Sequence, residues 1–240
     1  MKYNDIRKNY QNYSFIDTAL VDPYVAAISP IFTKLFIKFN IIPNQVTVLM
    51  IISGVLGAIL FSFPNLILKI LGVVFIHLWY IFDCSDGEVA RITKKFSKFG
   101  KEIDHMAHII NHPLYNLSFA YSMICLKRFN PTIILFLFMM VLAIDMINRY
   151  LESFYIIYDL RMESGGGTVK ENSMGKRIIL YIINIFVLYP NFALIFPIVY
   201  LIDANFNTNI TIYYLIAQVS VAGIIVLRNF VKRLINVVHL

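Results

Sequence analysis

Acidic residues and a histidine recur at helical spacing between residues 83 and 108. Asp83 and Asp86 close one long apolar run, and Asp104 and His108 open the next. Residues three or four positions apart lie on the same face of a helix, so each pair is expected to share a face. Two antiparallel helices joined at residues 94–98 would bring three carboxylates and an imidazole together.

This grouping indicates chemistry with a bound cation. Acidic side chains beside a bilayer are costly unless they bind something positive. Carboxylates are the ligands that Mg²⁺ and Mn²⁺ take when they act on phosphates. The pattern therefore predicts a divalent-metal site that works on a phosphate compound.

The spacing D-x2-D-G-x2-A-R-x8-G-x3-D resembles the signature of the CDP-alcohol phosphotransferases, also called CDP-alcohol phosphatidyltransferases. The family pattern continues with x3 and a further Asp, and that last position is His108 in this chain. The matching positions are Asp83, Asp86, Gly87, Ala90, Arg91, Gly100 and Asp104. So many fixed positions at a helix–loop–helix junction make the resemblance specific.

The resemblance implies a membrane enzyme with a defined reaction. Such an enzyme moves a phospho-alcohol group from a CDP-linked donor to the hydroxyl of a lipid, alcohol or glycan acceptor and releases CMP. This reaction belongs to phospholipid or phospho-glycan biosynthesis. The resemblance also implies Mg²⁺ or Mn²⁺, as two ions, on Asp83, Asp86 and Asp104, with Asp104 and His108 as the catalytic residues.

A second group of positions is implied for the nucleotide. Residues 43–47 read P-N-Q-V-T and resemble the turn that borders the nucleotide pocket in the same family. Arg91 would contact a donor phosphate or close the site through an acidic partner. The implied nucleotide-binding residues are Asn44, Thr47, Gly87, Ala90, Arg91 and Gly100.

His108 is the departure from the family pattern. The family residue at this position is assigned as the base that deprotonates the acceptor hydroxyl. Imidazole, with an ordinary pKa of about 6.5, can also serve as a base, but it brings one negative charge fewer to a second metal. Three interpretations stay open: a histidine base, catalysis without this base, and a weakened or inactive site.

A polar patch in the fourth apolar segment offers a further candidate. Asp145 and Arg149 lie four residues apart and are expected on one helical face. Arg149 is a candidate for binding an anionic group of the donor or acceptor. A structural ion-pair network is an equal alternative.

Composition places the chain in a membrane. It has 240 residues, of which 59% are hydrophobic and 15% charged, and its mean hydropathy is +0.70. Apolar runs of about 20 residues are long enough to cross the hydrocarbon layer. The net charge of +7 comes with lysines and arginines near the ends of these runs, which favours membrane lipids over nucleic acid as the partner.

These patterns predict an all-α fold, a polytopic membrane bundle of six transmembrane helices preceded by an amphipathic interfacial helix. Residues 1–42 are expected to form a cytoplasmic N-terminal segment that contains a broken amphipathic helix over 23–39. In that helix Phe32, Leu35, Phe36 and Phe39 form one stripe, and Thr33, Lys34 and Lys38 face elsewhere. Residues 43–240 form the catalytic domain, with spans near 45–62, 65–93, 102–126, 131–158, 177–202 and 209–227.

The distribution of basic residues predicts the orientation. With the termini, the 94–98 loop and the 161–177 loop on one side, all but Lys69, Lys127 and Arg128 of the 21 lysines and arginines lie on that side. The positive-inside rule makes this side cytoplasmic, where cytidine nucleotides are found. We expect an integral protein of a bacterial or archaeal inner membrane with a cytoplasmic active site.

The sequence leaves open two other functions and one oligomeric state. A catalytically impaired family member would bind a CDP-alcohol without turning it over. A small-solute transporter would use its intramembrane acids and arginines as a pathway, but the acids gather at one membrane face. A homodimer is compatible with the sequence.

Overall fold

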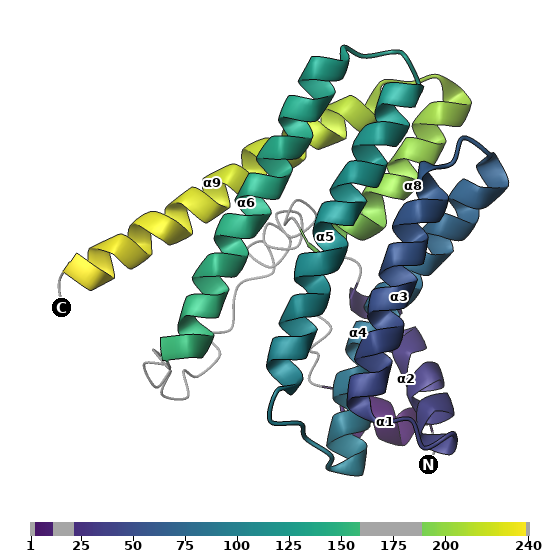
Figure 1. The fold of residues 1–240 in the computed structure, drawn as a ribbon, viewed down its shortest axis with the longest axis vertical. Coiled ribbons are helices and arrows are strands. Elements are labelled where there is room, and N and C mark those ends of the chain that lie inside the picture. Colours follow the sequence, from purple (N-terminus) through teal and green to yellow (C-terminus); the bar gives the residue numbers. More distant parts are fainter. Residues whose placement is uncertain (1–2, 12–21, 159–188, 239–240) are drawn as a thin grey trace.

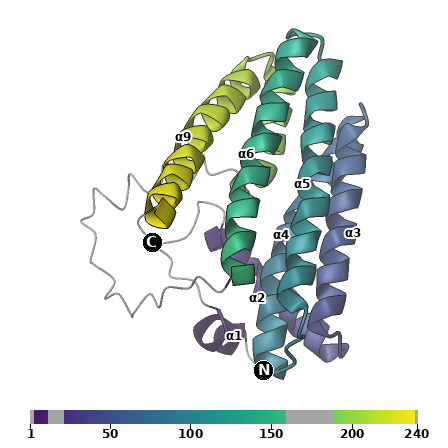
Figure 2. The same cartoon turned by 60° about the vertical axis from the view of Figure 1, so that its left-hand side comes forward.

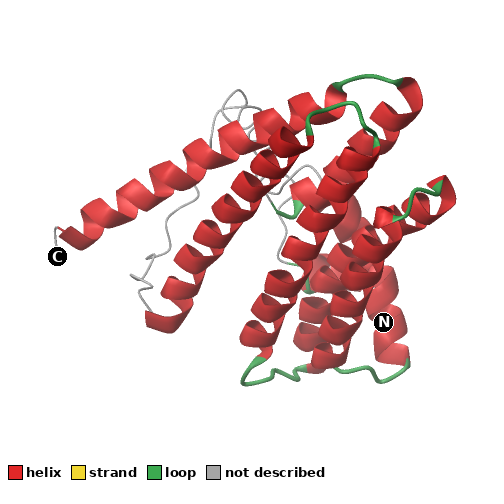
Figure 3. Ribbon diagram, turned by 45° about the horizontal axis from the view of Figure 1, so that its top comes forward, coloured by secondary structure: helices red, strands yellow, loops and turns green. Residues whose placement is uncertain are grey.

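The computed structural model describes residues 3–11, 22–158 and 189–238. Every regular element in these residues is a helix (Figures 1 and 3). The all-α prediction is therefore confirmed for this part of the chain. The helices are α1 Tyr3–Asn9, α2 Asp22–Lys38, α3 Pro43–Ser62, α4 Leu66–Thr93, α5 Gly100–Cys125, α6 Pro131–Tyr158, α8 Asn191–Phe206 and α9 Ile210–Val238.

Four of the described helices are long and apolar enough to cross a membrane. They are α3, α4, Pro131–Leu151 of α6 and Ile210–Val231 of α9, with mean hydropathies of 1.9 to 2.1. These helices support an integral membrane protein. α5 does not share this apolar character along its whole length, because its first turns contain Glu102, Asp104 and His108. The count of six spans stays a prediction.

The helices around the signature begin and end close to their predicted limits. The differences lie further along the chain, where α9 extends to Val238 and α8 covers Asn191–Phe206. Pro197 lies inside α8, and Pro190 precedes it. The 161–177 loop and the beginning of the predicted fifth span lie outside the described residues.

Small residues allow α3, α4 and α5 to approach closely. Gly57 of α3 and Gly72 of α4 meet where the two helices cross, and a Cβ on Gly72 would lie 2.6 Å from the backbone nitrogen of Phe61. Gly54 of α3 packs in the same way against the side chain of Asn111 in α5. These small residues bring the three helices of the signature region together (Figure 2).

α2 differs from its predicted form in two respects. It runs without interruption from Asp22 to Lys38 with Pro30 inside it, so the predicted break is wrong. It packs against α4, and the predicted apolar stripe is divided, because Phe36 is buried there together with Thr33. Leu35 and Phe39 are instead exposed. The position of α2 at a membrane interface stays a prediction.

The N-terminal helix and the loop between α4 and α5 lie at the same end of the bundle (Figures 1 and 2). A hydrogen bond from Arg91 Nε near the end of α4 to the carbonyl of Tyr10 just after α1 fixes this arrangement at 2.6 Å. α6 packs against α5 and α9 on the other side of the bundle. The signature residues are therefore surrounded by α1, α2, α3 and α5.

A substitution at the helix crossing tests this packing. Gly57→Ala would place a Cβ 2.7 Å from Ile76 Cγ1 and 2.9 Å from the Ile76 backbone nitrogen, so α3 and α4 must move apart. We expect the variant to lose about 1–3 kcal/mol of stability, the usual cost of overpacking. Thermal unfolding of the purified protein in detergent measures this loss.

Gly223→Ala in α9 is the matched control. Its Cβ would meet Ile144 Cδ1 at 3.5 Å, an ordinary contact, and alanine has the higher helix propensity. This variant should be as stable as the unchanged protein or slightly more stable. Equal unfolding temperatures for the two alanine variants would contradict the close crossing.

Candidate active site

The candidate site forms where α4 ends and α5 begins. α4 stops at Thr93 because Lys94 takes a left-handed conformation, with φ of 54°. α5 starts at Gly100 and returns along α4. This confirms the predicted antiparallel pair joined near residues 94–98, which carries the signature residues on facing helices.

Asp83, Asp104 and His108 lie together at this junction. His108 Nε2 is 3.4 Å from Asp83 Oδ1 and 3.5 Å from Asp104 Oδ1. Among the described residues these three form the group able to hold a metal ion, with their ligand atoms all within 4.8 Å of one another. His108 thus contributes an imidazole nitrogen to this group, and its replacement of a family aspartate stays a prediction.

The three side chains fit a divalent cation. Asp104 Oδ1 is buried and accepts no hydrogen bond, which is costly for a carboxylate oxygen unless a cation occupies its lone pairs. Ligands of an octahedral ion with bonds of about 2.1 Å lie about 3 Å from one another. The separations from His108 are only slightly longer than this, so a small ion fits with little rearrangement.

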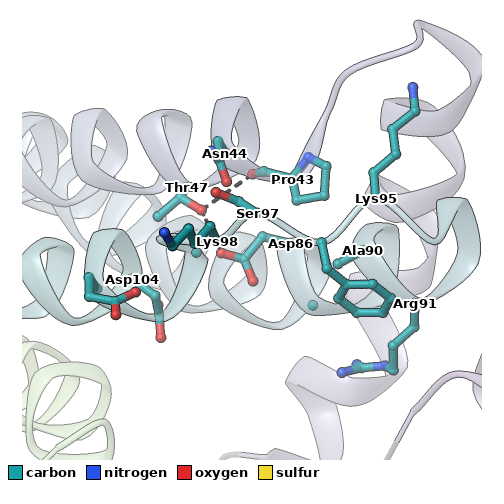
Figure 4. Close-up of a pocket in the computed structure, with 14 residues that line it drawn as sticks. Pro43, Asn44, Thr47, Asp86, Ala90, Arg91, Lys95, Ser97, Lys98 and Asp104 are labelled. Carbon is teal, nitrogen blue, oxygen red and sulfur yellow. Dashed lines mark hydrogen bonds between the residues drawn. The ribbon is translucent and has the colours of Figure 1, made fainter. Parts of the chain in front are cut away.

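Asp86 stands apart from this group and contacts α3 instead. Thr47 Oγ1 donates a 2.8 Å hydrogen bond to Asp86 Oδ2, and it also contacts the carbonyl of Pro43 one turn earlier. Both bonds are drawn in Figure 4. They tie the predicted nucleotide turn of α3 to the signature helix, and the role of Asp86 as a metal ligand stays a prediction.

A cavity of about 560 Å³ opens beside these residues. Its lining includes Asp86, Asp104 and all six residues expected at the nucleotide: Asn44, Thr47, Gly87, Ala90, Arg91 and Gly100. Figure 4 places Asp104 toward one end of the cavity and Arg91 toward the other, with Asp86 between them. The structure thus brings the predicted nucleotide-binding residues and two of the predicted metal ligands, Asp86 and Asp104, to one cavity.

The α4–α5 loop adds lining residues that sequence reasoning did not assign. Lys95, Phe96, Ser97 and Lys98 belong to the cavity wall, together with Glu102 at the start of α5. The sequence marked this loop as basic, and a basic loop beside a metal signature is the signal that identifies it as part of an anion site. Together with Arg91, the two lysines make the cavity suitable for a phosphate compound.

Arg91 has a partner that the sequence did not predict. Its Nε donates to the backbone carbonyl of Tyr10 at 2.6 Å, so the contact is a main-chain oxygen rather than an acidic side chain. A Cβ on Gly87 would lie 3.1 Å from Arg91 Nη1. The guanidinium therefore lies close over Gly87, which needs to be small for this reason.

Arg149 forms an ion-pair network, which is one of the two roles that the sequence left open for it. Its Nε lies 3.6 Å from Asp145 Oδ2 and 3.2 Å from His112 Nδ1. His112 is fully buried, contacts the same Asp145 oxygen at 2.8 Å and stacks on Tyr189 with ring centroids 3.6 Å apart. A contact between Arg149 and substrate stays a prediction.

Sequence reasoning also missed Glu88. This carboxylate is fully buried next to the signature Gly87 and accepts hydrogen bonds from Gln11, Ser29 and Thr33. These partners lie 77, 59 and 55 positions away in sequence. No local spacing could have indicated the contact.

The fold and the site define a class of protein. An apolar helical bundle carries at one end a group able to hold a metal ion and a cavity whose lining includes Arg91, Lys95 and Lys98. This arrangement suits a membrane enzyme that acts on phosphate compounds. The CDP-alcohol phosphatidyltransferase family model matches residues 40–226, most of the chain. This chain therefore belongs to the CDP-alcohol phosphatidyltransferase family, a family of transferases in lipid biosynthesis. A search of curated proteins finds no match.

Removal of one carboxylate tests the metal group. Asp104→Asn takes away the charge of the buried oxygen that lacks a hydrogen-bond partner. We expect Mn²⁺ binding to weaken roughly tenfold or more, because the ion loses a charged ligand. Electron paramagnetic resonance of added Mn²⁺ measures the bound fraction without any need for activity.

Glu102→Gln is the control for this experiment. Glu102 also lines the cavity but is not part of the metal group, so its loss should change Mn²⁺ affinity little. Equal affinities in Asp104→Asn and the unchanged protein would contradict the assignment.

Proposed function

We propose that this chain transfers a phospho-alcohol group from a cytidine-diphosphate-linked donor to an acceptor hydroxyl and releases CMP. The observation that carries the proposal is the position of Asp104, which belongs both to the metal group and to the wall of the cavity that Arg91, Lys95 and Lys98 also line. A donor diphosphate in this cavity would lie beside the metal group. The acceptor is a lipid, an alcohol or a glycan.

The residues of the cavity have distinct roles in this proposal. Asp83, Asp86 and Asp104 hold divalent metal, Mg²⁺ or Mn²⁺, in two ions as in the family. When bound, the metal would neutralise the charge that develops on the diphosphate oxygens. Arg91, Lys95 and Lys98 attract the anionic donor, and Arg91 contacts one of its phosphates. Asn44, Thr47, Gly87, Ala90 and Gly100 border the nucleotide, where the small residues leave room for it.

His108 is proposed as the base that receives the acceptor proton. The acceptor oxygen forms a bond to the β-phosphorus while the bond from that phosphorus to the bridging oxygen breaks. CMP leaves with the bridging oxygen, and the acceptor proton moves to the imidazole. The contacts of His108 Nε2 with Asp83 and Asp104 keep the ring beside the proposed metal ligands. His108 Nδ1 is buried without a hydrogen-bond partner, which supports it as the nitrogen that accepts the proton.

Arg149 is proposed to bind an anionic group of the donor or acceptor from the other side of the site. Its network with Asp145 and His112 supports this role because it holds a long cationic side chain on a rigid helix. The site is proposed to face the cytoplasm, as the excess of lysine and arginine on that side supports.

The proposed reaction has a direct test. The purified protein should release CMP from at least one CDP-linked alcohol in the presence of an acceptor and Mg²⁺ or Mn²⁺. Asp83→Asn should reduce the rate by on the order of 10²-fold or more, the usual effect of removing transition-state charge stabilisation. A coupled assay for CMP across a panel of donors and acceptors measures it.

Chelation completes this test, since EDTA should stop CMP release and added Mn²⁺ should restore it. Turnover that survives thorough chelation would contradict the metal-dependent mechanism. Binding of CDP without turnover of any donor would instead favour the catalytically impaired alternative.

The role of His108 is tested by two substitutions. His108→Ala should lower the turnover rate on the order of 10²-fold, a typical contribution of general base catalysis, because the acceptor proton loses its recipient. His108→Asp restores the family residue and should retain activity. CMP release by the two variants and the unchanged protein gives the comparison.

Mn²⁺ binding by the same variants separates a base from a metal ligand. A base predicts that His108→Ala keeps most of its Mn²⁺ affinity while its turnover collapses. A parallel loss of Mn²⁺ affinity and turnover would assign His108 to metal binding, and unchanged turnover in a well-folded His108→Ala would place the base elsewhere.

A further inference from the structure

The buried carboxylate of Glu88 holds the N-terminal segment, residues 3–11, against the signature helix. Gln11 Nε2 and Ser29 Oγ donate to Glu88 Oε1 at 2.7 and 2.6 Å, and Thr33 Oγ1 donates to Oε2 at 2.6 Å. All three donors are neutral side chains. Hydrogen bonds to an ionised oxygen are short and strong, and a carboxylate buried without a cation depends on them. The same amide nitrogen of Gln11 also donates to the Ala26 carbonyl at 2.7 Å and to Ser29 Oγ at 3.2 Å, so Gln11 is fixed to both α2 and α4.

The residue before Gln11 makes the second contact with α4. The carbonyl of Tyr10 accepts a hydrogen bond from Arg91 Nε at 2.6 Å. Glu88 and Arg91 lie three positions apart and so share one face of α4. Two consecutive residues of the N-terminal segment thus contact two neighbouring side chains of the signature helix.

These contacts determine where the Arg91 guanidinium lies. The bond to Tyr10 uses Nε, and the two Nη groups turn toward Gly87, where a Cβ would lie 3.1 and 3.4 Å from them. Arg91 and Gly87 both line the cavity. An arginine is a flexible side chain, so a fixed acceptor for Nε selects one of its many conformations.

We propose that the N-terminal segment completes the donor site, with Gln11 and Glu88 as positioning residues for Arg91. The Gln11–Glu88 contact holds Tyr10 in place, and the Tyr10 carbonyl orients the guanidinium over Gly87 to bind the diphosphate of a nucleoside-diphosphate donor. Neither positioning residue touches the donor. This inference rests on the proposed function, because it assigns the donor diphosphate to Arg91.

Gln11→Ala is the variant that tests the proposal. Glu88 keeps its bonds to Ser29 and Thr33 in this variant, so α2 stays attached to α4 and the fold is retained. Calorimetric titration with CDP in the presence of Mn²⁺ should give a dissociation constant raised about two- to tenfold, the range expected when one long side chain loses its preorganisation. In the CMP-release assay the donor KM should rise by a similar factor, with kcat changed less than twofold.

A double-variant comparison separates positioning from a general structural effect. In an Arg91→Ala background, Gln11→Ala should cause no further loss of CDP affinity, because the side chain that it positions is absent. Asn205→Ala serves as the control, since it removes an amide whose hydrogen bond to Leu201 is local to α8, and it should leave CDP affinity unchanged.

Two results would overturn the inference while the proposed function stands: unchanged CDP affinity in Gln11→Ala, or an equal loss in the Arg91→Ala background. A protein that binds no CDP and releases no CMP from any donor would overturn the proposed function and, with it, this assignment of Arg91. Glu88→Gln provides a second variant, which should weaken CDP binding in the same direction because its neutral amide holds Gln11 less strongly.

Discussion

Repulsion between carboxylates is the constraint on which the active end of this bundle depends. Asp83 and Asp104 face each other from antiparallel helices, and the ion pairs described for both involve His108. Lysines of the adjoining loop line the cavity but form no described ion pair with either carboxylate. A bundle that gathers acidic groups in this way is stable only because the packing of α3, α4 and α5 forces them together, and a divalent cation relieves the repulsion when it binds.

The close crossing of α3 and α4 does not depend on the candidate metal ligands. Backbone contact at Gly57 and Gly72 joins α3 to α4, and this contact uses no polar side chain of the site. Thr47 and Glu88 add hydrogen bonds at the margins of the cavity, one to Asp86 and the other to the N-terminal residues. None of these bonds involves Asp83, Asp104 or His108, so these three side chains could rearrange around a cation without loosening the bundle.

Sequence reasoning predicted the parts of this structure that depend on local spacing. The limits of α4 and α5 and the facing positions of Asp83 and Asp104 follow from helical periodicity and from a short polar loop. It failed where contacts join distant segments: Glu88 binds Gln11, 77 positions away, and Arg91 binds a backbone carbonyl, which no side-chain pattern reveals. The burial of Thr33 was missed for the same reason, since its partner Glu88 lies 55 positions away.

At the opposite end of the bundle, buried charged side chains have a structural role. Lys69 is buried, donates to the Phe61 carbonyl and to Ser122 at 2.7 and 2.8 Å, and lies over the rings of Phe61 and Tyr200. Arg128 pairs with the fully buried Asp203 at 2.9 Å. Each of these charges has strong partners within the chain, as the cost of burial requires. Asp104 Oδ1 is the contrasting case, because it is buried and has no hydrogen-bond partner. This lack of a partner for a buried carboxylate oxygen is the physical reason to place the chemistry at the junction of α4 and α5.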